Sequence, residues 1–451
     1  METVKKNSLE EINSTIPVPT GKARFIKKLF AFSGPGALVA VGYMDPGNWI
    51  TSIQGGAQYG YLLLSVILIS SLIAMLLQVM CAKLGIVTGM DLAQATKALV
   101  GQRTAIILWL TTELAIIATE MAEIIGSAIA LNLLFNIPLL LGVVITVVDV
   151  LLLLILIKFS IRKIEAVVFC LIITIFIIFS YEVALTHPNL SLIIRSFIPQ
   201  TEILTAHVSG GDSAFFIALG IVGATVMPHN LYLHSSIVQS RQYAREDPQA
   251  LEEAIRYATI DSNMQLGFSF IINCLLLILG ASLFFGKNPE DIGRFAQLYN
   301  ALQDHNMAGA IASSTLATLF AIALLASGQN ATITGTLTSQ IVMEGFINFT
   351  LPLWQRRIIN RLIAILPIIT GIYLWGEKGD VIEKLLVYTQ IFLSIALPIS
   401  MLPLLYLTSS RKRMGSFVNC KTFIIIGWLA NAVLIVLNIQ LIIKTMNMLF
   451  S

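Results

Sequence analysis

The chain has 451 residues, of which 56% are hydrophobic and only 12% are charged, and its mean hydropathy is +0.84. This composition excludes an ordinary soluble domain and indicates a protein that crosses a membrane many times. The net charge of +3 is small and the basic residues lie between apolar runs, which argues against nucleic-acid binding.

Eleven predominantly apolar runs approach or exceed the roughly 20 residues that a helix needs to cross a hydrocarbon core. None of them alternates strictly between apolar and polar residues, as a membrane β-strand would, so we expect an all-α polytopic membrane protein. The expected transmembrane helices cover residues 33–58, 62–86, 105–132, 136–158, 163–184, 213–239, 263–286, 311–346, 358–375, 384–408 and 422–447.

The basic residues predict the orientation of these helices, because cytoplasmic loops carry an excess of Lys and Arg. With a cytoplasmic N-terminus, most of the 28 basic residues fall on the inner side. The outer side then carries only Arg195, Lys287, Arg294, Lys378, Lys384 and Lys444. We therefore expect a multi-pass protein of the cell membrane, with its N-terminus in the cytoplasm and its C-terminus outside.

The first expected helix is interrupted by the sequence Asp45-Pro46-Gly47-Asn48. Pro46 and Gly47 are helix breakers, and Asp45 places a carboxylate at membrane depth. Broken backbone is tolerated there only where protein or a water-filled cavity covers it. Since an ionisable residue inside the membrane indicates function, this break is a candidate binding site.

The third expected helix carries three carboxylates, those of Glu113, Glu120 and Glu123, on one face. They span about 15 Å along the axis and are too costly to face lipid. A row of carboxylates that faces the protein interior is what a proton relay needs. For Glu113, which lies near the beginning of the helix, a structural role is the alternative.

The sixth expected helix is interrupted by Met227-Pro228-His229-Asn230, which shares the pattern X-Pro-X-Asn with the first break. The two breaks lie five helices apart, which predicts a five-plus-five inverted repeat. Its halves would be residues 33–184 and 213–408, with a cytoplasmic tail over 1–32 and an additional helix over 422–447. Matching breaks in two repeats indicate a transporter's binding site, and two unrelated proline kinks are the alternative.

His229 and His234 add titratable groups at the second break. Arg356 and Arg357 precede the ninth expected helix, and Arg361 lies one turn further along. We expect these arginines to pair with the glutamates of the third helix and to complete a proton route to the cytoplasm. The alternatives are that Arg356 and Arg357 are anchors at the membrane surface and that His234 is a packing residue.

The donor atoms at the two breaks favour a transition-metal cation. Unwound helix frees backbone carbonyls, Asp45 adds a negative charge and Asn48 adds an amide oxygen. Met227 offers a thioether sulfur, which is a poor ligand for Mg²⁺ and Ca²⁺ because these ions bind oxygen ligands. Sulfur suits a softer ion, so we predict Mn²⁺, Fe²⁺ or Co²⁺, with Cd²⁺ as a toxic passenger.

The two break motifs together resemble the natural-resistance-associated macrophage protein (Nramp) family, the proton-coupled divalent metal transporters, and in particular its bacterial manganese and iron transporters. The resemblance covers nearly the whole chain and implies the amino-acid/sodium symporter-type fold. Further stretches that are similar to the family are Gly42-Tyr43-Met44, Glu113-Leu114-Ala115-Ile116-Ile117-Ala118-Thr119, Ser327-Gly328-Gln329, Thr332-Ile333-Thr334-Gly335-Thr336 and Met343-Glu344-Gly345-Phe346.

The resemblance implies that Asp45, Asn48, Met227 and the carbonyl of Ala224 are the metal ligands. It also implies that Gln390, in the tenth helix, joins the site when the site closes. From the residues alone, a hydrogen bond between helices explains Gln390 equally well.

The chain departs from the family pattern at three places, none of which is a proposed ligand. Glu120 stands where aspartate is usual, which keeps the carboxylate but moves it outward by one methylene. Asn360 stands where threonine is usual, and Thr338-Ser339 replace the usual Ala-Gly.

We therefore expect proton-coupled uptake of divalent transition-metal ions by alternating access. The expected partners are metal ions, protons and the lipid bilayer, and we expect a monomer with no cofactor and no enzymatic activity. One alternative is a Mg²⁺ transporter of the same fold, against which Met227 argues. Others are a sodium-coupled amino-acid symporter, whose substrate carboxylate Asp45 would repel, and a non-transporting metal sensor, for which a soluble domain is missing.

Overall fold

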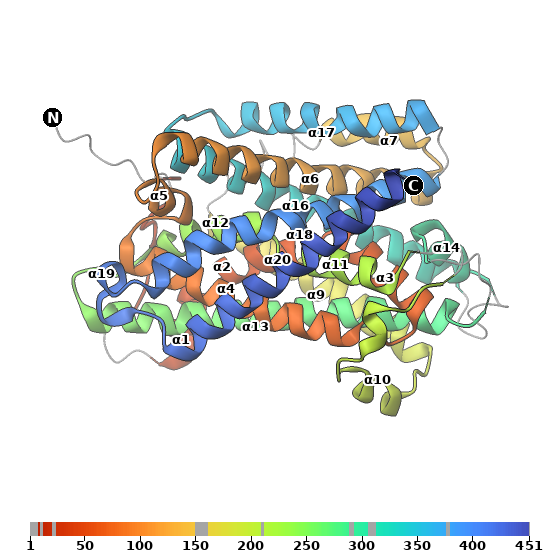
Figure 1. Cartoon of the computed structure of the whole chain (residues 1–451), viewed down its shortest axis with the longest axis horizontal. Helices are drawn as coiled ribbons and strands as arrows, with labels where there is room; N and C mark the ends of the chain where they lie inside the picture. The colour runs from red at the N-terminus through yellow and green to blue at the C-terminus, as the bar shows by residue number, and fades with distance from the viewer. Residues whose placement is uncertain are drawn as a thin grey trace.

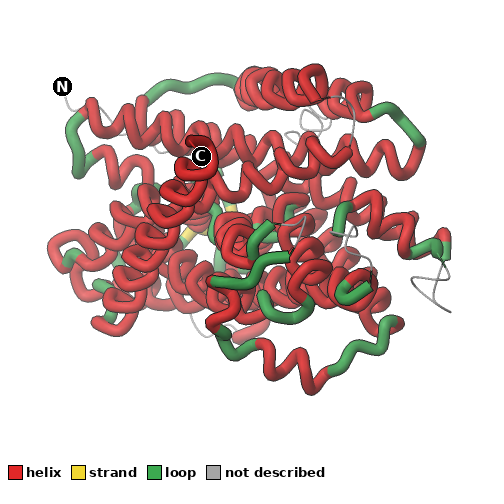
Figure 2. Tube along the Cα trace, turned by 45° about the vertical axis from the view of Figure 1, so that its right-hand side comes forward, coloured by secondary structure: helices red, strands yellow, loops and turns green. Residues whose placement is uncertain are grey.

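The computed structural model describes residues 8–9, 12–19, 24–148, 161–208, 212–287, 293–304, 313–375 and 379–450. Helices dominate these residues (Figure 2). The first half contains α1 Phe25–Phe32, α2 Pro35–Gly42, α3 Pro46–Tyr59, α4 Leu64–Thr88, α5 Leu92–Lys97, α6 Gln102–Phe135, α7 Leu139–Ile145, η1 Thr146–Val148, α9 Ile161–Leu185 and α10 Leu190–Ser196. The second half contains η2 Thr201–Leu204, α11 Ala214–Thr225, α12 Pro228–Ile237, η3 Val238–Ser240, α13 Pro248–Phe284, α14 Phe295–Ala301, α16 Ser314–Ile347, α17 Leu353–Trp375, α18 Gly379–Ser409, α19 Arg411–Met414, η5 Gly415–Phe417 and α20 Lys421–Phe450.

Nine helices among the described residues are long and apolar enough to cross a membrane, and a tenth span results when α1 and α2, bent by 51°, are joined. The prediction of an all-α polytopic membrane protein is confirmed. The count of eleven stays a prediction, because residues 149–158 of the fourth expected helix lie outside the described residues. Parts of the expected tail (1–7, 10–11 and 20–23) also lie outside them, and the division into two repeats stays a prediction.

The first expected helix is broken where the sequence predicted. Helix α2 ends at Gly42 and α3 begins at Pro46. Asp45 is the N-cap of α3, and its carboxylate accepts a hydrogen bond from the Asn48 N–H. Pro46 occupies the first helical position, where a missing N–H costs nothing. Asp45 and Pro46 therefore interrupt the span and at the same time start its second half, α3.

The sixth expected helix is broken in the same way, between α11, which ends at Thr225, and α12, which begins at Pro228. Met227 is the N-cap of α12. Both predicted interruptions are thus confirmed. The prediction for Gly47 is corrected in one respect: this residue lies inside α3, so the break does not depend on its flexibility.

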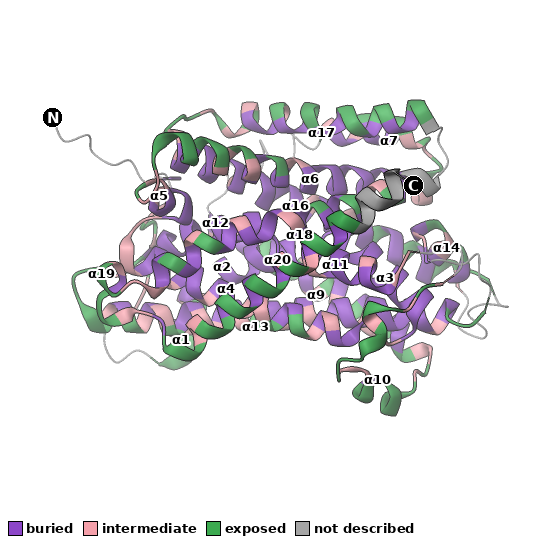
Figure 3. Cartoon of the chain, in the orientation of Figure 1, coloured by how far each residue is buried: buried purple, intermediate pink, exposed green. Residues whose placement is uncertain are grey.

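The two broken spans form the centre of the molecule (Figure 1). Every residue of α2, α3 and α12 is buried. Helices α4 and α13 pack against them, as do α6, α16 and α18. Helices α17 and α7 lie along the outer edge of α6, and α20 crosses the surface with a largely exposed face (Figures 1 and 3).

The N-terminal segment, which we expected to be a cytoplasmic tail, is partly bound to the helical body. Strand β1 (Ile16–Pro17) pairs in parallel with β2 (Arg241–Gln242), which follows α12 and η3. The backbone N–H of Leu9 donates to the Glu344 carboxylate at 2.9 Å, at the end of α16. The segment therefore contacts the C-terminal end of α16 and the residues that follow α12.

Asp261 of α13 holds the bend between α1 and α2. Its carboxylate accepts hydrogen bonds from the Ser33 hydroxyl at 2.7 Å, the Gly34 N–H at 3.1 Å and the Gly36 N–H at 2.8 Å. Because Gly34 has a φ of 134°, its backbone adopts a conformation that a residue with a side chain rarely takes. A neighbouring helix thus supplies the N-terminal cap that α2 lacks in its own sequence.

Substitution of this cap should destabilise the protein more than substitution of an exposed one. Asp261→Ala leaves buried N–H donors unpaired, which costs about 1–3 kcal/mol for each donor. Asp247→Ala, which removes the exposed N-cap of α13, is the matched control and should cost about 1 kcal/mol. Thermal unfolding in detergent measures both, and equal losses in the two variants would contradict the role of Asp261.

Candidate functional site

Asp45 is a fully buried carboxylate at the centre of the candidate site. Its Oδ1 atom accepts hydrogen bonds from the Asn48 backbone N–H at 2.9 Å and from Asn48 Nδ2 at 3.0 Å. Its Oδ2 atom has no hydrogen-bond partner among the described residues. A buried carboxylate oxygen without a donor is costly unless a cation or a proton satisfies it.

The carbonyl of Ala224 lies on the other side of the same amide. In a continuous helix the N–H four residues later would bond it, but that residue is Pro228, which has no N–H. Asn48 Nδ2 donates to the Ala224 carbonyl instead, at 2.8 Å. The positively polarised NH₂ group therefore lies between two oxygens, and a half-turn of the amide would bring its own oxygen beside them.

Met227 lies fully buried at the beginning of α12, three residues after Ala224. Its side chain packs in a small apolar cluster with Ala115 and Ala118 of α6 and with Leu393 and Ala396 of α18. The thioether thus borders apolar side chains as well as the break. The ligand role of Met227 stays a prediction.

Gln390 of α18 lies against both breaks. A methyl group on Gly47 would be 1.9 Å from Gln390 Nε2, and one on Gly223 would be 2.0 Å from the Gln390 backbone carbonyl oxygen. Gly223 is therefore required for the close approach of the α18 backbone, whereas at Gly47 the contact is with the end of the Gln390 side chain. The Oε1 atom of Gln390 is buried without a hydrogen-bond partner in the described structure.

The described residues contain no cluster of three or more His, Cys, Asp or Glu side chains that could hold a metal ion. The candidate site instead combines one carboxylate with an amide, a backbone carbonyl and a thioether. A single charge with neutral donors suits an ion that must be released again rather than one held permanently.

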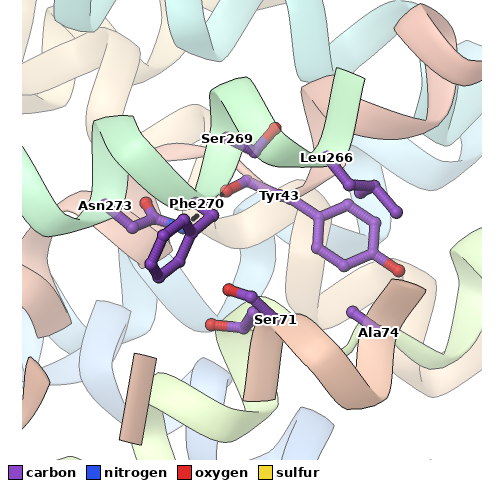
Figure 4. A pocket seen from close by; sticks show the side chains of 8 residues that line it. Tyr43, Ser71, Ala74, Leu266, Ser269, Phe270 and Asn273 are labelled. Carbon is purple, nitrogen blue, oxygen red and sulfur yellow. Dashed lines mark hydrogen bonds between the residues drawn. The ribbon is translucent and has the colours of Figure 1, made fainter. Parts of the chain in front are cut away.

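A polar residue that the sequence analysis did not single out lies beside Asn48. Asn273 of α13 donates through Nδ2 to the Tyr43 carbonyl at 3.1 Å and lies 3.5 Å from Asn48 Oδ1. Thr225 and Asn273 line a small pocket, and Figure 4 shows Tyr43 and Asn273 facing Ser71 of α4 across it. Asn273 is an isolated polar residue in an apolar span, which is a weak signal without the structure.

The two predicted histidines have different surroundings. His234 Nδ1 lies 2.9 Å from Gln78 Oε1, and Gln78 Nε2 donates to the Tyr43 hydroxyl at 2.7 Å. This series of polar contacts runs from α12 through α4 to the first break. His229 Nδ1 lies 3.4 Å from the Thr119 hydroxyl of α6, one residue before Glu120.

The structure brings the predicted glutamates and arginines together. Arg357 pairs with Glu120, and Arg361 contacts the other oxygen of Glu120 at 3.2 Å. Glu123 Oε2 lies 3.8 Å from each of these arginines and accepts a hydrogen bond from the Thr332 hydroxyl at 3.1 Å. These charges are fully buried, so Arg357 is not a surface anchor.

Glu113 and Arg356 form a third pair at the beginning of the row. Two of the expected departures from the family pattern meet here, because the Ser339 hydroxyl accepts hydrogen bonds from Arg356 Nε and, at 2.9 Å, from Asn360 Nδ2. Arg356 is also buried. Side chains absent from the usual pattern thus hold the arginine that pairs with Glu113. Whether the row carries protons stays a prediction.

The chain is similar to known proteins along nearly its whole length. Residues 36–444 match the family model described as "Natural resistance-associated macrophage protein-like". The divalent metal cation transporter MntH of Latilactobacillus sakei is 59% identical over 443 residues, which is 98% of this chain and 95% of that protein. MntH of Staphylococcus saprophyticus is 58% identical over 438 residues, with 97% of each chain covered.

Comparison with solved structures identifies the fold. A mutant of the Eremococcus coleocola manganese transporter superposes with a TM-score of 0.90 at 48% identity, covering 99% of this chain and 92% of the other. A nucleobase-cation-symport-1 family transporter shares the fold alone, with a TM-score of 0.57 at 16% identity, covering 84% and 78%. These relatives are transporters and not enzymes, as expected. This chain contains both broken spans, and the family model matches most of its length. It therefore belongs to the Nramp family.

Proposed function

We propose that this chain imports divalent transition-metal ions, Mn²⁺ and Fe²⁺ with Co²⁺ and Cd²⁺ as further cargo, by alternating access in symport with protons. One observation carries the proposal: the buried Asp45 carboxylate has an oxygen without a hydrogen-bond partner among the described residues, and Asn48 links its other oxygen to the carbonyl freed in the second broken helix. The names of the relatives, which are divalent metal cation and manganese transporters, support it.

In the proposed bound state, Asp45, Asn48, the Ala224 carbonyl and Met227 hold the ion. The Asn48 amide turns so that its oxygen replaces its NH₂ group between the carboxylate and the carbonyl. The thioether favours transition metals over Ca²⁺ and Mg²⁺. Gln390, already packed against Gly47, adds an amide oxygen when the site closes.

The orientation predicted from the basic residues directs the transport. Helices α3 and α11 then form the outer halves of the broken spans, and α2 and α12 form the inner halves. Movement of the outer halves would admit the ion, and movement of the inner halves would release it to the cytoplasm. A potential that is negative inside favours this direction by about 2.3 kcal/mol per charge per 100 mV.

Protons are proposed to travel along α6. Metal binding requires Asp45 to be ionised, so a proton bound there is displaced. His229 and Thr119 lead from the second break toward Glu120, and Glu123 offers an oxygen that has no hydrogen-bond partner among the described residues. That oxygen could accept a proton without loss of the Glu120–Arg357 pair. Metal and proton would thus leave by different routes.

Met227→Ala should weaken the preference for Mn²⁺ over Ca²⁺ without abolishing uptake. Loss of the sulfur leaves only oxygen ligands, so the ratio of Mn²⁺ to Ca²⁺ uptake should fall about tenfold. Uptake into proteoliposomes measures this ratio. Met401→Ala, which changes a fully buried methionine of α18, is the matched control. A wild type that transports Mg²⁺ and Mn²⁺ equally would contradict the role of the sulfur.

Asp45→Ala should abolish uptake of every divalent ion, because it removes the only charge of the proposed ligand set. Binding measured by calorimetry should be lost together with uptake. Mn²⁺ binding at wild-type affinity in this variant would move the site elsewhere in the molecule.

Glu120→Gln should reduce the number of protons that enter with each metal ion while metal binding is retained. The amide cannot take up a proton and removes the charged partner nearest to Arg357, which keeps only Glu123 at 3.8 Å in this row. Glu165→Gln is the matched control, because Glu165 also forms a buried pair, with Arg241, but lies on α9. Simultaneous recording of internal pH and metal uptake gives the ratio, and an unchanged ratio would remove Glu120 from the proton route.

A further inference from the structure

The two breaks free two backbone carbonyls at equivalent positions. A carbonyl in a helix bonds the N–H four residues later, and proline has no N–H. Pro228 therefore frees the carbonyl of Ala224, and Pro46 frees the carbonyl of Gly42 in the same manner. Each freed carbonyl lies three residues before the first residue of its X-Pro-X-Asn motif.

Each asparagine of these motifs reaches across to the other broken span. Asn48 of α3 donates to the Ala224 carbonyl of α11. Asn230 of α12 lies against Gly42 of α2, where a methyl group would be 2.1 Å from Asn230 Nδ2 and 3.0 Å from its Oδ1. The second contact repeats the first with the roles of the two spans exchanged.

The two asparagines nevertheless differ in their hydrogen bonds. Asn48 donates to both Asp45 and Ala224. Asn230 is fully buried, and neither its Oδ1 nor its Nδ2 has a hydrogen-bond partner in the described structure. Such an amide carries a large desolvation penalty, since buried polar side chains are nearly always paired. An apolar residue would fill the same place without that penalty.

The location of Asn230 indicates at which step of transport its amide would act. The Asn48–Ala224 contact joins α3 and α11, whereas Asn230 and Gly42 join α2 and α12, the halves nearer to the N-terminal segment and β2. In the proposed orientation, these are the inner halves. An ion that moves from Asp45 toward the cytoplasm must pass between them.

We propose that Asn230 is a second amide ligand, which takes hold of the divalent cation between the Asp45 site and the cytoplasm. This inference rests on the proposed function and adds an exit-side station to it. The Asn230 oxygen is a neutral donor, so it holds the ion more weakly than the Asp45 carboxylate does. A weak second station lowers the barrier to release without trapping the ion.

Asn230→Ala separates this role from a contribution to the Asp45 site. Equilibrium Mn²⁺ binding should stay within about threefold of the wild type, whereas Mn²⁺ uptake into proteoliposomes should fall about tenfold. Asn431→Ala, which changes a buried and incompletely paired amide of α20, is the matched control and should change neither quantity. Wild-type uptake by Asn230→Ala would overturn the proposal. Loss of Mn²⁺ binding at an unchanged unfolding temperature would also overturn it, because Asn230 would then belong to the first site.

Asn230→Asp provides a second test in case the alanine variant does not fold. A charged oxygen at this station should retain the ion, so Mn²⁺ should bind more tightly while maximal uptake falls about tenfold. A charge that leaves both quantities unchanged would show that the ion does not pass this residue.

Failure of the proposed function gives a different result from failure of this inference. If the chain does not transport metal, the wild type will import no Mn²⁺ and Asp45→Ala will change nothing. If only the inference fails, the wild type will import Mn²⁺, Asp45→Ala will abolish uptake, and the Asn230 variants will behave like the wild type.

Discussion

The structure depends on one constraint, which is that backbone polar groups inside a membrane need partners. Two prolines each remove a donor from an otherwise continuous span, and the freed carbonyls are available only because other helices enclose them. Asn48 satisfies the Ala224 carbonyl from the opposite span. The same requirement keeps α2, α3, α11 and α12 at the centre of the molecule, since no helix with an open backbone could face lipid.

A second constraint governs the row of charges along α6. Buried charges are tolerated when they are paired, and α17 supplies an arginine for each level of that row. Ser339 and Asn360 extend the pairing at Glu113 through hydrogen bonds. Ser339 and Asn360, two of the expected departures from the family pattern, thus lie in one polar cluster, and the Glu120 side chain reaches Arg357 and Arg361.

Much of the fold could be predicted because membrane helices can be recognised in a sequence by their length and apolarity. Both breaks were found at the correct residues, because proline beside polar residues is conspicuous in an apolar run. The place of Gly47 could not be predicted from the same pattern: it lies inside α3, against the Gln390 side chain, rather than in the break itself. Likewise, the N-terminal segment looked like a free polar tail, although β1 pairs with β2 through backbone groups that carry no sequence signal.

The sequence by itself determined the class of protein, the two breaks and the kinds of donor atoms they offer, because these follow from composition and from local backbone chemistry. Only the tertiary structure decided which donors meet. Asn273 and Gln78 are single polar residues in apolar spans, and nothing local distinguishes a packing amide from one beside the site. Their partners lie on helices far apart in the chain, so their roles arise from packing and not from spacing.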